Sequence, residues 1–285
     1  MNLPVTNANR RLLLQAGGSL ALLNLLPLAA SAAATPAPAA PAASSINMLE
    51  AINQAGRQRM LSQRMAKLYA QVIRETRQDE AHKLLGDSMA LFEKQLDNLH
   101  NFVQQKNAID IIATYDQLSS RWQDYKRVVA TDPNRTGLQQ VVALNEQVLA
   151  TAHAGTLQLE KLHGGALGKL VNMSGRQRML SQRISKFYFF RRDGVATAEC
   201  IKNMNAARTE FLAAMNTLKQ APENTNDINA WIAMGEAQWL FFDEAVHADT
   251  SDRSELAYHD NNVAITSENI LQVMDRLTNY YAALT

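Results

Sequence analysis

One stretch of this sequence occurs twice: INQAGRQRMLSQRMAKLYA at residues 52–70 and VNMSGRQRMLSQRISKFYF at residues 171–189. The nonapeptide GRQRMLSQR is identical in the two copies, which lie 119 residues apart. The same offset pairs Phe92 with Phe211, whereas most other positions differ. Self-similarity at one fixed offset indicates modules built on one plan. The sequence therefore predicts two tandem modules of about 120 residues each.

Apolar residues recur at helical spacing in both modules, and short turn-forming segments separate the runs. Helices are expected at residues 46–77, 79–104, 108–130, 137–162, 166–192, 196–220, 225–248 and 252–283. Because the links are short, consecutive helices should run antiparallel. The predicted fold class is all-α, with two tandem up-down four-helix bundles. The segment HGGALG (163–168) is either a break between the bundles or a flexible point in one long helix.

The N-terminal residues are typical of an export signal. Arg10 and Arg11 precede an apolar run that is short for a membrane span, and small residues around 32–34 offer a cleavage point. The arginine pair resembles a twin-arginine signal, which predicts a periplasmic location without a membrane span in the mature chain. The expected organisation is an export signal at 1–34, a Pro/Ala linker at 35–45, and bundles at 46–164 and 165–285.

Composition excludes several classes of function. The 28 Lys and Arg nearly balance the 27 Asp and Glu, so overall charge gives no reason to expect a nucleic-acid partner. Cys200 is the only cysteine, which leaves no internal disulfide and no c-type haem motif. No phosphate-binding loop or Ser/His/Asp set is evident, so neither an enzyme nor a cofactor is expected. His153 and His163 are predicted to be ordinary helix-surface residues.

On a helix, the repeated stretch sorts into faces. Leu61, Met65, Leu68, Tyr69 and Val72 form the core face, and Asn53, Arg57, Arg64, Lys67 and Gln71 gather opposite. Arg59 lies on the flank with Gly56 one turn before it, and Arg178 has the same relation to Gly175. A glycine at this spacing lets another helix or a ligand approach the guanidinium. The polar face is expected to be either solvated or engaged in an interface.

The local charge has one sign, because no Asp or Glu occurs in residues 51–74 or 161–192. Arginine offers a planar fork of donors that suits a planar oxyanion. Met60 and Met179 each lie in the middle of the polar face, which suggests that the first helices of the modules lie side by side, with Arg59 and Arg178 converging on one anion. The candidate ligand-binding residues are Gly56, Arg59, Met60, Gly175, Arg178 and Met179, with Asn53, Gln63, Asn172 and Gln182 as secondary candidates.

The segment INQAGRQRMLSQRMAK resembles the first helix of the PilJ-type N-terminal domain of type IV pilus chemotaxis transducers. It is also similar to the periplasmic P-box helix of NarX-type nitrate/nitrite sensors. The resemblance implies four-helix bundles in which a Gly and an Arg of the first helix contact nitrate at a symmetric interface. Carried onto this chain, the Gly falls on Gly56 and Gly175 and the Arg on Arg59 and Arg178, each followed by Met60 or Met179.

The predicted function is therefore that of a periplasmic sensory or accessory protein that binds nitrate, nitrite or a similar small anion and communicates with a membrane sensor or chemoreceptor. One alternative is a ligand-free interaction module that docks a partner through Arg57 and Arg64. A second is a di-metal carboxylate bundle enzyme, suggested by the Glu-x-x-His pairs Glu160/His163 and Glu244/His247. Whether the two motif copies form one shared anion site or two stays open at this point.

Overall fold

The computed structural model describes residues 46–248 and 252–284, and this part of the chain is helical, without strands. Its helices are α1 (Met48–Ile73), α2 (Gln78–Gln105), α3 (Ile109–Val129), α4 (Arg135–His163), α5 (Ala166–Arg192), α6 (Thr197–Lys219), α7 (Asn226–His247) and α8 (Arg253–Ala282). The all-α prediction is confirmed. The predicted export signal and linker, residues 1–45, lie outside the described residues.

Local sequence signals set the helix ends. The side chain of Asn47 caps α1 by accepting a hydrogen bond from the Glu50 amide at 2.8 Å, and Asn134 caps α4 through the Gly137 amide at 2.9 Å. Gly164 ends α4 with φ at 73°, a conformation that favours glycine. The segment HGGALG is thus a true break, since α5 begins two residues later.

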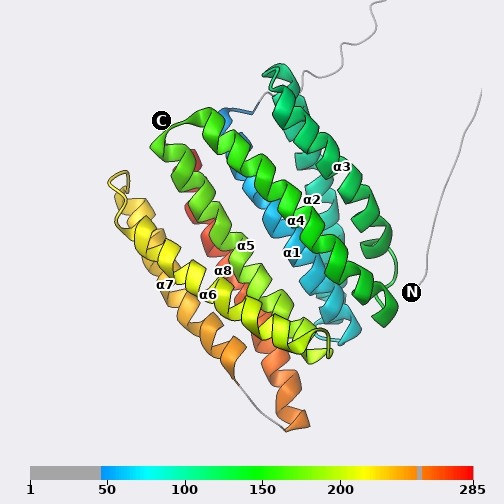
Figure 1. Ribbon diagram of the computed structural model, residues 1–285. Helices are drawn as coiled ribbons and strands as arrows, with labels where there is room; N and C mark the ends of the chain where they lie inside the picture. The colour runs from blue at the N-terminus through cyan, green and yellow to red at the C-terminus, as the bar shows by residue number, and fades with distance from the viewer. Residues whose placement is uncertain (1–45, 249–251, 285) are drawn as a thin grey trace, which may run out of the picture. The chain divides into compact units, whose positions relative to one another are not determined.

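The helices pack in two sets that share a central interface (Figure 1). In the N-terminal half (α1–α4), α1 lies against α2 and α4, and α3 lies against α4. In the C-terminal half (α5–α8), α5 lies against α6 and α8, and α7 lies against α8. The most extensive contact between any two helices joins α1 to α5. All eight helices consequently belong to one compact unit, Ser44–Thr285.

Equivalent aromatic pairs hold the interior of each half. Phe92 stacks on Trp122 with ring centroids 4.3 Å apart, and Phe211 stacks on Trp239 at 4.2 Å. Stacked aromatic rings contribute about 0.5–1.5 kcal/mol beyond the area that they bury. The sequence repeat therefore corresponds to a repeated packing arrangement, even where other residues differ.

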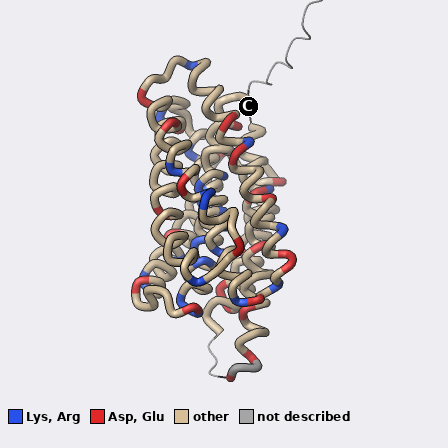
Figure 2. The backbone as a smooth tube through the Cα atoms, turned by 90° about the vertical axis from the view of Figure 1, so that its right-hand side faces the viewer, with Lys and Arg blue, Asp and Glu red and all other residues tan. Residues whose placement is uncertain are grey.

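The α1–α5 interface is unusually polar for the middle of a helical protein. Arg59, Arg178, Lys67 and Lys186 are all fully buried there. Figure 2 shows Lys and Arg positions in blue along the length of the helices, interspersed with Asp and Glu in red. Among the described helices, none is long and apolar enough to cross a membrane.

Candidate functional site

The two repeated glycines lie where α1 crosses α5. A Cβ atom added to Gly56 would lie 3.9 Å from the Cα of Gly175, so the two backbones approach closely. The same Cβ would lie 3.2 Å from Nη2 of Arg59 and 3.3 Å from Nη2 of Arg178. The absent side chains thus leave the space that the two guanidinium groups fill. We call these four residues the arginine crossing.

Arg59 reaches from α1 to the start of α5. Its Nη2 donates to Oδ1 of Asn172 at 2.7 Å and to the Asn172 carbonyl at 3.3 Å. Its Nη1 lies 3.3 Å from Nδ1 of His153 on α4, and its Nε has no hydrogen-bond partner. Within the described part of the chain, no carboxylate forms an ion pair with this buried guanidinium. Arg59 is therefore a buried cation whose side-chain hydrogen bonds all go to neutral groups.

Arg178 makes the equivalent contact with a backbone carbonyl but has an acidic partner as well. Its Nη2 donates to the Asn53 carbonyl at 3.1 Å, as Arg59 does to Asn172. Its Nη1 donates to Oδ1 of Asp275 on α8 at 2.5 Å. The two arginines thus occupy equivalent positions, but only Arg178 forms an ion pair with a carboxylate among the described residues.

The electrostatics reflect burial and the proximity of like charges. Burial, reinforced by Arg176 and Arg178, lowers the pKa of Arg59 from its usual value to about 9. Burial also lowers the pKa of Arg178 to about 10, although Asp275 opposes this shift. Both groups stay protonated at neutral pH. A negative ligand near Arg59 would relieve this unfavourable burial of charge.

His153 is not the ordinary surface residue that the sequence predicted. It is half-buried on α4, and its Nδ1 lies between Nη1 of Arg59 and Nη1 of Arg176, at 3.3 and 3.4 Å. Burial, together with these two arginines, lowers the pKa of His153 to about 4. The helical period did not reveal this position, because the contact depends on α5, which belongs to the other half.

A second polar cluster, which we call the lysine layer, lies further along α1 and α5. It comprises Lys67, Lys186, Glu146, Glu268, Gln63, Asn145 and Ser267. Nζ of Lys67 donates to Glu268 of α8 at 2.5 Å, and Nζ of Lys186 donates to Glu146 of α4 at 2.5 Å. Arg64 and Arg183 reinforce the same two carboxylates. Each lysine is thus neutralised by the opposite half of the protein.

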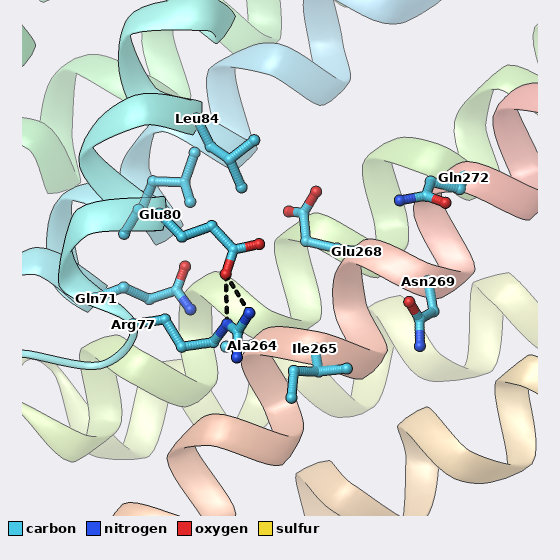
Figure 3. Close-up of a pocket in the computed structure, with 11 residues that line it drawn as sticks. Gln71, Arg77, Glu80, Leu84, Ala264, Ile265, Glu268, Asn269 and Gln272 are labelled. Atoms are coloured by element: carbon cyan, nitrogen blue, oxygen red, sulfur yellow. Dashed lines mark hydrogen bonds and ion pairs between the residues drawn. The ribbon is translucent and has the colours of Figure 1, made fainter. Parts of the chain in front are cut away.

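The lysine-layer carboxylates border cavities at the surface. Glu268 points from α8 towards α2, beside a groove of about 180 Å³ in which Arg77 and Glu80 are also paired (Figure 3). Glu146 borders an equivalent groove of about 260 Å³ between α4, α5 and α6. Solvent can therefore reach the carboxylates, while the lysines stay buried.

These contacts give a structural reason for the repeated nonapeptide. Gln58 donates to the Phe92 carbonyl at 3.2 Å, and Gln177 donates to the Phe211 carbonyl at 3.3 Å. Lys67, which the sequence assigned to the polar face of its helix, is buried in the interface and is not solvated. The motif glutamines thus join α1 to α2 and α5 to α6, and the motif arginines join α1 to α5, which by itself constrains these polar residues.

The secondary candidates divide between the two clusters. Asn53 and Asn172 lie at the arginine crossing, where their carbonyls accept from Arg178 and Arg59. Gln63 and Gln182 do not: their hydrogen bonds go to the lysine layer and to the Ser267 carbonyl. The sequence placed them one turn from the arginines, but their side chains extend the other way.

Met60 and Met179 are buried, as a helix-to-helix contact requires. Met179 also lines a cavity of about 330 Å³ between α4, α5 and α6, together with His153 and Arg176. This cavity adjoins the contact network of Arg59 through His153. It gives a small molecule a place beside the arginine crossing.

The di-metal alternative receives no support from the geometry. Within residues 46–248 and 252–284, no three His, Cys, Asp or Glu side chains gather as a metal site requires. Glu160 instead accepts a hydrogen bond from Asn172, and His247 contacts the Asp243 carbonyl at 2.8 Å.

Comparison with known proteins adds the family context. Residues 42–152 match the family model of the N-terminal domain of type IV pili methyl-accepting chemotaxis transducers, PilJ. The match covers α1, α2, α3 and the first part of α4. No curated protein matches the chain, and no solved structure does. Residues 42–152 are thus similar to a sensory or interaction domain of chemotaxis transducers.

Proposed function

We propose that this protein is a periplasmic sensor or accessory component that binds a small oxyanion, nitrate or nitrite first, at the arginine crossing. The observation that carries the proposal is Arg59, a fully buried guanidinium with no ion pair among the described residues. Removing a charge from water costs several kcal/mol unless a counter-charge compensates. Nitrate is flat and has three acceptor oxygens, which suits the planar donor fork of arginine.

Sensing requires that the ligand favour one arrangement of the helices over another. Arg59 and Arg178 each donate across the α1–α5 interface to a carbonyl of the opposite helix. An anion that drew either guanidinium towards itself would weaken these bonds and shift the packing of α1 on α5. This interface joins the two halves, so a local binding event would change their relative arrangement.

Isothermal titration of the purified chain with nitrate, nitrite, chloride and sulfate tests the proposal. Saturable heat with nitrate or nitrite, lost in Arg59→Ala, is the expected result. Arg208→Ala is the matched control, because Arg208 pairs with Asp243 and does not line the cavity beside His153. The absence of heat with every anion would refute anion binding.

The periplasmic location rests on the sequence of residues 1–34. Arg10 and Arg11 would be essential if the chain uses a twin-arginine route. Fractionation of cells that express the full chain should recover it from the periplasm. Replacement of both arginines by lysine should leave it in the cytoplasm, and equal export of both forms would contradict the twin-arginine route.

A second candidate function is docking onto a membrane receptor or pilus component. Arg57 and Arg64, the residues first considered for this role, are engaged with Asp275 and Glu268 inside the protein. The surface of α7 offers a better site, because Leu240 and Phe241 are 69% and 60% exposed beside an apolar groove of about 460 Å³. Loss of co-sedimentation with host membranes on Leu240→Lys would support docking there.

A further inference from the structure

The two halves differ in the residue of α4 or α8 that contacts the arginines of the crossing. Shifting α4 by 122 residues onto α8 pairs Glu146 with Glu268, and the same shift pairs His153 with Asp275. In the lysine layer the two halves have equivalent carboxylates. At the arginine crossing, an acid in the C-terminal half corresponds to an imidazole in the N-terminal half.

In the C-terminal half, the protein supplies the negative charge itself, through the carboxylate of Asp275. Its Oδ1 accepts from Nε and Nη2 of Arg57 at 3.2 and 2.8 Å, and from Nη1 of Arg178 at 2.5 Å. Burial would raise the pKa of Asp275, but Arg178 and Arg57 outweigh it and lower the value to about 2. One carboxylate thus bridges an arginine of α1 and an arginine of α5.

His153 occupies the corresponding place between Arg59 of α1 and Arg176 of α5. Both arginine nitrogens are donors, so Nδ1 must face them with its lone pair and the ring must be neutral. Arg176 has Glu210 as a partner, whereas Arg59 has no ion pair in the described part of the chain. A neutral ring therefore stands where the other half has a carboxylate.

The site in the N-terminal half also has space. His153 and Arg176 line the cavity of about 330 Å³ between α4, α5 and α6, with Met179, Arg183 and Glu210 among its other walls. A nitrate, nitrite or short carboxylate ion is much smaller than this volume. Such an ion could displace the imidazole contact and bridge the same two donors.

We propose that the protein binds one exogenous anion per chain, between Arg59 and Arg176 beside His153, in the place that the Asp275 carboxylate takes in the other half. The inference rests on the proposed function and sharpens it. The ligand class is a planar, singly charged oxyanion that imitates a carboxylate: nitrate, nitrite, formate or acetate. Sulfate is tetrahedral and doubly charged, whereas the Asp275 carboxylate that the ligand would replace is planar and singly charged.

Two reciprocal substitutions test this assignment by titration with nitrate and with acetate. His153→Asp supplies the missing carboxylate from the chain, so it should reduce anion affinity at least tenfold and raise the thermal midpoint in anion-free buffer. Asp275→Asn opens the second position, so the stoichiometry should rise from one anion per chain to two. His82→Asp on the exposed side of α2 is the control for the change in charge.

The outcomes separate the two proposals. If nitrate binds the unmodified chain and His153→Asp equally well, the assignment to His153 is overturned while anion sensing stands. If no anion binds the unmodified chain, the proposed function fails and this assignment fails with it. Circular dichroism verifies folding, and should Asp275→Asn unfold, the His153→Asp titration and its thermal midpoint still decide the question.

Discussion

Arg59 and Arg178 place their Nη2 atoms within 3.3 Å of a single point above Gly56, although one residue belongs to α1 and the other to α5. Two buried cations would separate if nothing held them. Each is held by a carbonyl of the opposite helix, and Asp275 neutralises only Arg178. The crossing is therefore both a structural contact and a place where negative charge is lacking.

Gly56→Ala should destabilise the protein by about 1–3 kcal/mol, the usual cost of overpacking. The new Cβ would lie 3.2 and 3.3 Å from two guanidinium nitrogens that are hydrogen-bonded and have little room to move. Urea unfolding measures the change. Gly86→Ala is the control, because it lies exposed on α2 with nothing within 4 Å and should stabilise by about 0.5–1 kcal/mol. Equal stability of the two variants would show that the crossing is loosely packed.

Glu268→Gln should cost about 3–5 kcal/mol, because it leaves Lys67 buried without a counter-charge. Glu236→Gln removes the partner of Lys219, a pair that is exposed on both sides, and should cost less than about 1 kcal/mol. Denaturant midpoints of the two variants provide the comparison. A small effect of Glu268→Gln would mean that water reaches Lys67 through the groove between α1, α2 and α8.

Acid should weaken the protein in a defined range. Burial opposes ionisation of Glu268 and Asp275, but Lys67 and Arg178 outweigh it, so both pKa values fall to about 2, from 4.5 and 3.8. Between the folded and the unfolded pKa values, the unfolded chain then binds more protons than the folded chain. The stabilisation is complete above about pH 4.5 and is lost as the pH falls towards 2. Unfolding free energies measured across this range should fall less steeply in the double variant Glu268→Gln, Asp275→Asn.

Arg59→Lys should keep the charge at the crossing but lose the planar fork. Nitrate affinity should fall at least tenfold, about 1.4 kcal/mol, because an ammonium group lacks the fixed, planar set of donors that a guanidinium offers. Titration calorimetry measures the change, with Arg208→Lys as the surface control. Unchanged affinity in Arg59→Lys would assign binding to another group.

The sequence by itself determined the helices and the resemblance between the two halves. Helical spacing, capping residues such as Asn47 and Asn134, and the Gly164–Gly165 break are local signals, and the predicted helix ends lie within a few residues of those observed. The repeat also indicated that α1 and α5 would meet. Local rules suffice here, because a helix forms from contacts between residues three and four apart.

Only the tertiary structure decided what the repeated arginines and lysines contact. No acid on α1 after Glu50 or anywhere on α5 neutralises them. Their partners lie far away in the sequence: Arg57 meets Asp275 at a separation of 218 residues, and Lys67 meets Glu268 at 201. The partner of a buried charge is set by which helix packs against it. The helical period of one segment cannot show which helix supplies that partner. The difference between His153 and Asp275 gains meaning only in the tertiary structure, which places His153 of α4 between Arg59 and Arg176 and Asp275 of α8 between Arg57 and Arg178.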